Sequence, residues 1–396
     1  MSDYLFVNPF LHPPGGGEGV ANWMIQVLAA RGQVTVLTWT PPDFEEIDAY
    51  YGTTLQNHPN VRCLNAAPLL RPLFERFGVP HELLKTGLLL QRARRLRKKF
   101  RYCFSCYDEM DLGPPAVQYV HYPRMLFTFL KKSEPCPWPG ALWARLLWPV
   151  YVRMAYYLSR SEIENIRRNV TITNSNWTAE QYRKRIQGTV ERVIYPPPLG
   201  DADCRPESER EPAFLTIGRV EPSKDWLTLI SLIERVRARG HEVKLTLAGS
   251  RFDDDFLSLL QDTLKGKEEW VSLLLDLPRD ELDASIGRHA FGLHGKSEEP
   301  YGMAVAELVL GGCLTFVPDS GGQVEIVGVG DLCFSDVDDA VDKICNVLSD
   351  RHLRKRLATE LATQTEQITR QAFVGGFHQF LDDLENGCVP EGRPIL

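Results

Sequence analysis

The hydrophobic residues in the first half of the chain form short runs, separated by longer stretches of helical pattern. Short runs rich in Val, Ile, Tyr and Phe predict buried strands. The predicted strands are residues 4–7, 34–39, 61–65, 102–105, 117–120, 171–173 and 193–195. The run Tyr195-Pro196-Pro197-Pro198 then ends regular structure, because consecutive prolines form a stiff spacer.

The second half repeats the alternation. Strands are predicted at 214–217, 243–248, 271–275, 290–293 and 313–317, with helices at 224–238, 256–264, 281–287 and 303–310. Regular alternation indicates parallel βαβ units in a doubly wound sheet. We therefore expect an α/β protein with two Rossmann-like domains, residues 1–198 and 199–370, facing each other across a cleft, and a C-terminal helix within 371–396 packed near the first domain. Ligands bind outside the carboxyl ends of such strands, so two facing sheets offer a site for two substrates.

Composition narrows the class of protein. The chain has 396 residues, enough for two or three domains, and its 43% hydrophobic and 24% charged content is that of an ordinary globular protein. The net charge of −7 argues against general nucleic-acid binding. Nine scattered cysteines, and a strand that follows directly on Met1-Ser2-Asp3, favour a reducing, cytoplasmic compartment.

Two features that could indicate other classes are weak. Cys103 and Cys106 form a C-x-x-C pair without a second pair at zinc-ligand spacing, so we interpret them as strand residues. The most apolar segment, residues 141–158, is interrupted by Arg145, Pro149 and Arg153. It does not reach the roughly 20 uninterrupted apolar residues that a membrane span needs.

Two glutamates eight residues apart, Glu299 and Glu307, flank the start of the predicted 303–310 helix, with Pro300 and Gly302 suited to its first turn. A helix rises about 1.5 Å per residue, which would separate the carboxylates by roughly 10 Å along the axis. One carboxylate could meet sugar hydroxyls and the other ribose hydroxyls, with a phosphate on free backbone N–H groups between them. The spacing alone also fits a surface helix with two ordinary glutamates.

A loop with basic residues follows the first strand of the second domain. Gly218 permits a tight turn there, and Arg219 and Lys224 would lie at the carboxyl end of the sheet. An arginine can bind a diphosphate bidentately, and a lysine adds a point charge. The alternative is a solvated loop before a helix that begins at Ser223.

The first domain offers two candidate features. Gly16 and Gly17 precede a helix predicted from Val20, where backbone can approach a phosphate or a sugar. A dinucleotide fingerprint would need a glycine where Val20 stands. His121 follows the predicted strand 117–120 and could bond a sugar hydroxyl or carry a proton, or be an ordinary histidine at a strand end.

These motifs in this order resemble the family 4 retaining glycosyltransferases of the GT-B fold, over most of the chain. The most specific match is Glu299-Pro-Tyr-Gly-Met-Ala-Val-Ala-Glu307, which fits the E-x7-E element of that family, followed by the glycine-containing segments 311–313 and 319–322. Segments 119–123, 174–178 and 193–197 look most like the branch of lipid-linked-oligosaccharide mannosyltransferases. Tyr301 departs from the pattern, since phenylalanine is commoner there.

The resemblance implies roles for the candidate residues. Arg219 and Lys224, beside Gly218, would neutralise the donor diphosphate, whose charge grows as the nucleotide leaves. Glu307 would hold the ribose hydroxyls, and Glu299 would orient the sugar. Backbone N–H groups of Tyr301, Gly302 and Met303 would assist Glu299. Gly16 and Gly17 would let the first domain approach the substrates, and His121 would contact sugar and acceptor.

The implied reaction needs no cofactor and no metal, because cationic side chains neutralise the diphosphate. Asp201-Ala202-Asp203 has the D-x-D form that holds a metal in another glycosyltransferase fold, but here it follows the prolines, and we interpret it as linker carboxylates. We expect transfer of a hexose to a glycan or a lipid-linked glycan, from UDP-glucose or another UDP-hexose, with GDP-mannose close behind. The alternatives are a GT-B nucleotide-sugar epimerase or hydrolase, and a non-catalytic sugar-binding subunit, against which the intact candidate residues argue.

Two basic segments bear on the acceptor. Residues 92–101 hold seven basic residues and no acid, and residues 124–160 hold six basic residues and eight aromatics, among them Trp138, Trp143 and Trp148. Basic and aromatic residues in one surface suit anionic headgroups. The predicted partners are therefore a nucleotide sugar, a glycan acceptor and the inner face of a membrane, but no nucleic acid. The alternative is a helical hairpin whose aromatics pack into the first domain.

Overall fold

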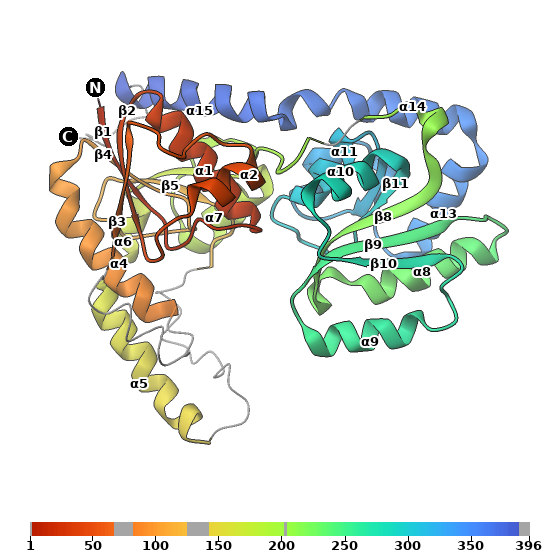
Figure 1. Cartoon of the computed structure of the whole chain (residues 1–396), viewed down its shortest axis with the longest axis horizontal. Coiled ribbons are helices and arrows are strands. Elements are labelled where there is room, and N and C mark those ends of the chain that lie inside the picture. Colours follow the sequence, from red (N-terminus) through yellow and green to blue (C-terminus); the bar gives the residue numbers. More distant parts are fainter. Residues whose placement is uncertain (1, 67–81, 125–141, 202–203, 388–396) are drawn as a thin grey trace. The chain divides into compact units, whose positions relative to one another are not determined.

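The computed structural model of the protein describes residues 2–66, 82–124, 142–201 and 204–387 (Figure 1). The chain divides into two units: Met1–Ile194 with Val374–Leu396, and Tyr195–Phe373. Each unit contains one parallel sheet covered by helices, which confirms the prediction of two Rossmann-like α/β domains. The division falls between Ile194 and Tyr195, at the start of the proline run. The sequence analysis places the boundary at the other end of the same run, after residue 198.

The first unit has a seven-stranded sheet within the described residues, in the order β3-β2-β1-β4-β5-β6-β7. The strands are β1 (Ser2–Val7), β2 (Gly32–Thr38), β3 (Val61–Asn65), β4 (Tyr102–Ser105), β5 (Val117–Val120), β6 (Val170–Thr173) and β7 (Arg192–Val193). Strands β4, β5 and β6 are buried along their whole length, as parallel strands covered on both faces must be. The strand order reverses between β1 and β4, the point at which such sheets bind ligands.

Helices surround this sheet. They are α1 (Gly16–Ala29), α2 (Phe44–Tyr51), α4 (Glu82–Leu96), α5 (Leu142–Ser159), α6 (Ile163–Arg167) and α7 (Asn176–Ile186), with the 3₁₀ turn η1 (Arg97–Lys99). The last helix, α15 (Arg370–Glu385), ends in the first unit. There Phe377 packs edge-on against Phe104 of β4, with ring centroids 6.3 Å apart, and Arg31 donates to Asp382 at 2.7 Å. The end of the chain therefore helps to close the first core.

In the second unit, the described residues form a six-stranded sheet in the order β10-β9-β8-β11-β12-β13, which reverses between β8 and β11. The strands are β8 (Glu211–Val220), β9 (Lys244–Arg251), β10 (Val271–Leu275), β11 (His289–Leu293), β12 (Leu314–Pro318) and β13 (Cys333–Phe334). The helices are α8 (Trp226–Ala238), α9 (Asp254–Leu264), α10 (Arg279–Arg288), α11 (Met303–Leu310), α12 (Gln323–Val327), α13 (Val337–Ser349) and α14 (Arg351–Ala362). The 3₁₀ turns are η3 (Glu207–Glu209), η4 (Pro222–Lys224), η5 (Gly330–Leu332) and η6 (Thr365–Ile368).

Four predicted helices begin elsewhere: α1, α8, α9 and α10 start at Gly16, Trp226, Asp254 and Arg279 instead of residues 20, 224, 256 and 281, whereas α11 starts at Met303 as predicted. Helix α1 begins at Gly16, so Gly16 and Gly17 belong to its first turn rather than to a loop before Val20. Helix α8 begins only at Trp226, because Asp225 has a φ of 56° and interrupts the helix predicted from residue 224. Gly302, with a φ of 105°, precedes α11 instead of forming its first turn.

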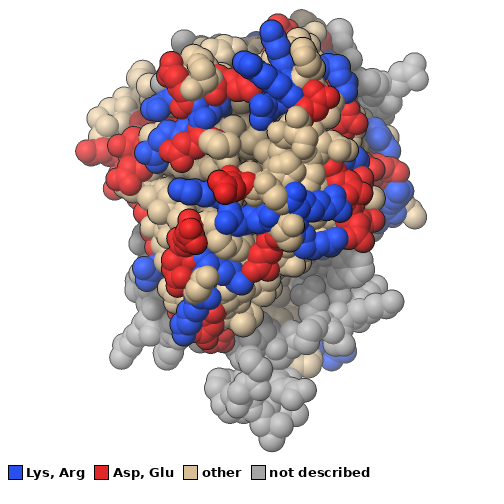
Figure 2. All heavy atoms as spheres, turned by 90° about the vertical axis from the view of Figure 1, so that its right-hand side faces the viewer, with Lys and Arg blue, Asp and Glu red and all other residues tan. Residues whose placement is uncertain are grey.

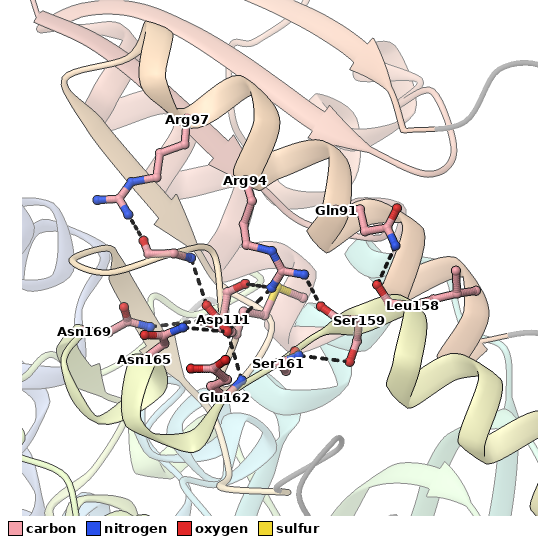
Figure 3. A network of polar contacts seen from close by, with 12 residues as sticks. Gln91, Arg94, Arg97, Asp111, Leu158, Ser159, Ser161, Glu162, Asn165 and Asn169 are labelled. Carbon is pink, nitrogen blue, oxygen red and sulfur yellow. Dashed lines mark hydrogen bonds and ion pairs between the residues drawn. The ribbon is translucent and has the colours of Figure 1, made fainter.

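Two basic residues of the segment 92–101, Arg94 and Arg97, contact backbone carbonyls within the first unit (Figure 3). Arg94 donates to the carbonyl of Asp111 at 2.9 Å and to the carbonyl of Ser159, and Arg97 donates to the carbonyl of Gly113. The Asp111 carboxylate, 3.6 Å from Arg94, is buried. These arginines therefore join α4 and η1 to the loop before β5 and to the end of α5.

Four other basic residues of this segment are exposed to solvent, whereas Arg92 is half-buried. Arg95, Lys98, Lys99 and Arg101 are exposed, and α5 exposes a set of large hydrophobic side chains. These side chains are Val150, Met154, Tyr156 and Tyr157. Trp138 and the side chain of Trp143 lie outside the described residues.

Figure 2 shows basic and acidic side chains interspersed over one face of the molecule, as is typical of a solvated surface. In the second unit, exposed pairs such as Arg239 with Asp342 and Arg356 with Asp331 follow this pattern. Among the described residues, no helix combines the length and the hydropathy that crossing a bilayer requires.

Candidate active site

The loop after β8 turns Lys224 back toward the end of the sheet. Gly218 lies directly beside this side chain, since a Cβ at that position would be in van der Waals contact with Cγ of Lys224 at 3.4 Å. The 3₁₀ turn η4 and the left-handed Asp225 then redirect the chain into α8, which the buried Trp226 anchors in the core. The Nζ of Lys224 donates to Oε2 of Glu299 at 2.9 Å, although the two residues are 75 positions apart.

Glu299 is the centre of a charged cluster. Its Oε2 lies 2.9 Å from Nζ of Lys224, 3.3 Å from Nζ of Lys296 and 3.6 Å from Nε2 of His294. Burial alone would raise the pKa of Glu299, but His294, Lys224 and Lys296 outweigh it and hold the pKa well below its usual range. Burial also lowers the pKa of His294, so this histidine is neutral at neutral pH. Two lysines against one carboxylate leave an excess of positive charge for an anionic ligand.

The loop after β12 fixes the backbone of Glu299. Glu299 forms an isolated bridge with Gly321, and Gly322 donates its N–H to the carbonyl of Glu299 at 2.8 Å. Gly321 has a φ of 83°, and a Cβ there would lie 2.4 Å from the Glu299 carbonyl oxygen, so only glycine fits. Gln323 adds a side-chain hydrogen bond to the carbonyl of Lys296 at 3.0 Å. Glu299 therefore sits on an extended segment, and the helical rise cannot be used for its distance from Glu307.

In the segment between Glu299 and α11, the side chain of Tyr301 is buried in the core, and only the backbone is left to contact a ligand. Tyr301 is 2% exposed, and its ring stacks on Tyr195 at a centroid distance of 5.7 Å. Its side chain is therefore a core group, so only its backbone can serve a ligand. Gly302 turns the chain into α11, whose first N–H groups, including that of Met303, have no acceptor within the helix.

Glu307 has a different environment from Glu299. It is 4% exposed, and its Oε1 accepts from Nη1 of Arg279 at 3.1 Å and from the N–H of Leu199 at 3.2 Å. Burial raises the pKa of Glu307, while Arg279 and the Leu199 N–H oppose that rise. Sequence reasoning missed Arg279, since its i,i+4 spacing to Asp283 indicates only an ordinary helical ion pair.

Arg219 lies apart from the Glu299 cluster. Its Nη2 is 2.9 Å from Glu221, and its guanidinium lies 4.4 Å from the ring centroid of Phe252 at the end of β9. The side chain is 53% exposed, so it is free to turn toward a ligand. Phe252 is itself exposed, and the sequence carried no signal for its contact with Arg219.

In the first unit, the structure brings His121 next to the start of α1. A Cβ on Gly17 would lie 3.3 Å from Nε2 of His121, so a side chain there would crowd the ring. The Sγ of Cys106 is 3.4 Å from the same nitrogen, and Asp108 accepts from the His121 N–H at 3.2 Å. Burial lowers the pKa of His121, which keeps the ring neutral and able to exchange hydrogen bonds with hydroxyls. Gly16 lies one residue earlier in the same turn.

The D-x-D segment is described only in part. Asp201 pairs with Arg370 at 3.2 Å, and Asp203 lies outside the described residues.

Comparisons with known proteins agree with this geometry. Residues 204–363 match the sequence model of the family "Glycosyl transferases group 1". Among solved structures, sucrose-phosphate synthase from Thermosynechococcus elongatus superposes with a TM-score of 0.67 at 14% identity, covering 98% of this chain and 100% of that one. Anabaena HepE in complex with UDP and glucose gives a TM-score of 0.65 at 16% identity, covering 98% of this chain and 100% of that one. The second unit thus carries a group 1 glycosyltransferase domain on a GT-B fold, which confirms the resemblance to the family 4 type.

Curated relatives are more specific. The GDP-Man:Man(3)GlcNAc(2)-PP-Dol alpha-1,2-mannosyltransferase of Candida glabrata is 25% identical over 232 residues, which cover 54% of this chain and 45% of that protein. The mouse protein of the same name is 25% identical over 237 residues, covering 53% of this chain and 47% of that protein. The chain therefore spans less than half the length of these relatives. They belong to the lipid-linked-oligosaccharide mannosyltransferase branch that the sequence resembles.

Proposed function

We propose that this protein is a retaining glycosyltransferase that transfers mannose from GDP-mannose to a lipid-linked oligosaccharide. The observation that carries the proposal is the Lys224–Glu299 cluster at the reversal point between β8 and β11, within a group 1 glycosyltransferase domain. The names of the curated relatives support GDP-mannose as the donor. We therefore propose GDP-mannose as the donor in preference to the UDP-hexose expected from the sequence. The UDP complex of HepE, at 16% identity, supports only the fold.

The cationic side chains would bind the donor diphosphate. Lys224 and Lys296 flank Glu299, and the exposed Arg219 can leave Glu221 to reach a phosphate. Negative charge on the diphosphate grows as the bond to mannose breaks. Donors aimed at such charge stabilise the transition state by about 3–4 kcal/mol each.

The two glutamates would hold the two sugars of the donor. Glu299 is ionised, because its pKa is lowered, and its carboxylate can accept from mannose hydroxyls. The N–H groups at the start of α11, near Met303, have no acceptor within the helix and suit a phosphate or a hydroxyl. Glu307 would accept from the ribose hydroxyls. Gly218, Tyr301 and Gly302 would act through their backbone positions.

Retention follows from the donor and the named product. GDP-mannose carries an α-linked mannose, and the relatives are named for an alpha-1,2 product, so the configuration is kept. The acceptor hydroxyl would attack the face that the diphosphate leaves, through an oxocarbenium-like state. His121, neutral and next to Gly17, would contact mannose and acceptor in the first domain. A lipid-linked acceptor would place the protein at the inner face of a membrane, where the exposed side chains of α5 could meet lipid.

Transfer of labelled mannose tests the proposal. Purified protein is incubated with labelled GDP-mannose or UDP-glucose and a lipid-linked oligosaccharide, and the label in the lipid fraction is measured. We expect label from GDP-mannose, removable by an α-mannosidase. Free or epimerised sugar that forms without acceptor would indicate a hydrolase or an epimerase. Binding of GDP without any conversion of GDP-mannose would indicate a sugar-binding subunit.

A thermal-shift panel tests donor choice independently. A ligand present at 100 times its dissociation constant stabilises the folded protein by about 2.7 kcal/mol. GDP-mannose should raise the melting temperature more than UDP-glucose. A larger rise in melting temperature with UDP-glucose than with GDP-mannose would indicate that the donor is a UDP-hexose.

A further inference from the structure

Arg279, the first residue of α10, contacts two carboxylates at once. Its Nη1 donates to Oε1 of Glu307 at 3.1 Å, and its Nε donates to Oδ1 of Asp283 at 2.9 Å. The side chain is 16% exposed. A planar guanidinium held on both edges has little freedom to rotate, so it fixes whichever carboxylate it meets.

The interdomain linker completes the same network. The N–H of Leu199 donates to Oε1 of Glu307 at 3.2 Å, and the N–H of Asp201 donates to Asp283 at 3.3 Å. A Cβ on Gly200 would lie 2.1 Å from the Arg279 guanidinium, so the chain passes directly over that group. Every member of this network belongs to the second unit.

Both of these hydrogen bonds to Glu307 use Oε1, so Arg279 and Leu199 fix one oxygen of the carboxylate. Oε2 is then the atom that would accept from a ligand. The carboxylate is 4% exposed. A carboxylate so buried stays ionised only with a charge partner. In the ionised form both oxygens act only as acceptors, whereas protonation turns one of them into a donor and weakens its hold on ligand hydroxyls.

We propose that Arg279 is a positioning residue for nucleotide binding, which holds Glu307 in the orientation and charge state that accept the ribose hydroxyls of a nucleoside diphosphate. This inference rests on the proposed function, in which Glu307 binds the donor ribose. Arg279 acts through Glu307 and makes no contact with the reacting atoms.

The pKa values agree with this role. Burial disfavours the charged form of Arg279, but Glu307 and Asp283 outweigh it, and the pKa of Arg279 is raised. The pKa of Glu307 is already raised by burial against the opposing effect of Arg279. Removing the guanidinium should raise it further, so the ionised fraction of Glu307 should fall as the pH decreases.

Calorimetric titration with GDP between pH 5.5 and 8 tests the inference. Arg279→Met is expected to raise the Kd of GDP about tenfold or more at pH 7.5, with a further rise toward acid pH. Arg279→Lys should recover part of the affinity and remove most of the acid dependence, because it restores the charge without the fork. Glu307→Gln should bind weakly at every pH. Arg239→Met, which removes an exposed ion pair with Asp342, is the matched control and should bind as the wild type does.

The outcomes separate the inference from the proposed function. If the wild type binds GDP and Arg279→Met binds it equally well across the pH range, the positioning role is wrong and the function stands. A uniform loss of affinity that Arg279→Lys does not relieve would make Arg279 a purely structural residue. If the wild type binds neither GDP nor UDP, the proposed function fails as well. Should Arg279→Met not fold, Arg279→Gln, which keeps a donor without the charge, is read in the same way.

Discussion

Replacing Lys224 by alanine removes the cation that lies 2.9 Å from Glu299 at the proposed diphosphate site. Lys224 is 14% exposed, so water replaces its ammonium group poorly. Loss of one donor to a developing anion costs about 3–4 kcal/mol in the transition state. Because each 1.4 kcal/mol is about tenfold in rate, we expect turnover to fall about 100-fold or more.

The same change should leave the protein folded. Removing one partner of a fully buried ion pair costs about 3–5 kcal/mol of stability. Glu299 is 15% exposed and keeps Lys296 at 3.3 Å and His294 at 3.6 Å, so the charge is not left alone. We therefore expect a smaller loss of unfolding free energy, about 1–2 kcal/mol.

Steady-state kinetics with GDP-mannose, together with thermal unfolding, separate the two effects. Lys265→Ala is the matched control, since Lys265 pairs with Asp262 at 2.7 Å but is 77% exposed and lies outside the site. This control should keep full turnover. A folded Lys224→Ala protein with turnover within a few-fold of the wild type would refute the role of Lys224 in leaving-group stabilisation.

Four further expectations follow from the same structure. Arg219→Ala should lower turnover about 100-fold with little change in melting temperature, since the side chain is 53% exposed, and normal turnover would contradict its role. The pKa of Glu299 is lower in the folded protein than the unfolded value of about 4.3, so its ion pairs stabilise the fold above that pH, and this stabilisation is lost as the pH falls toward the folded pKa. In acid-unfolding experiments, Glu299→Gln should therefore make the stability depend less on pH below about 4.3. Initial rates should survive EDTA, because lysines and arginine supply the positive charge; loss of activity that Mg²⁺ restores would overturn this. Flotation with anionic vesicles should weaken with salt and on changing Arg95, Lys98 and Lys99 to glutamine, by about 1 kcal/mol each, and no flotation at low salt would exclude a membrane surface there.

The alternation of strands and helices could be predicted because burial on both faces leaves a local trace. Parallel strands such as β5 and β6 are short, wholly buried runs in which valine, isoleucine and tyrosine alternate with a few polar residues. The prolines after Tyr195 mark the division between the units. Helix starts were less predictable. The start of α8, for example, depends on a single backbone dihedral, the positive φ of Asp225, which an aspartate does not usually adopt.

The contacts of the site carry no local trace at all. Lys224 meets Glu299 across 75 positions, and Arg94 meets Ser159 across 65, so each pairing depends on how the sheet brings separate loops together. The basic segment 92–101 is an example. Its sequence suggests one exposed basic surface, but in the fold Arg94 bonds to the carbonyl of Ser159 and lies 3.6 Å from the buried Asp111 carboxylate. The glycine that fixes Glu299, Gly321, was visible in the sequence, but its purpose was not.

The E-x7-E spacing also hides a difference between its two carboxylates. Glu299 lies among two lysines and a neutral histidine, which together lower its pKa and keep it ionised at neutral pH. Glu307 is buried and depends on one guanidinium, that of Arg279, and its pKa is raised. Loss of a single lysine therefore leaves Glu299 charged, whereas loss of Arg279 would leave Glu307 without a charge partner among its described contacts. As the pH is lowered, Glu307 should therefore become protonated and weaken nucleotide binding at a higher pH than the one at which Glu299 loses its charge.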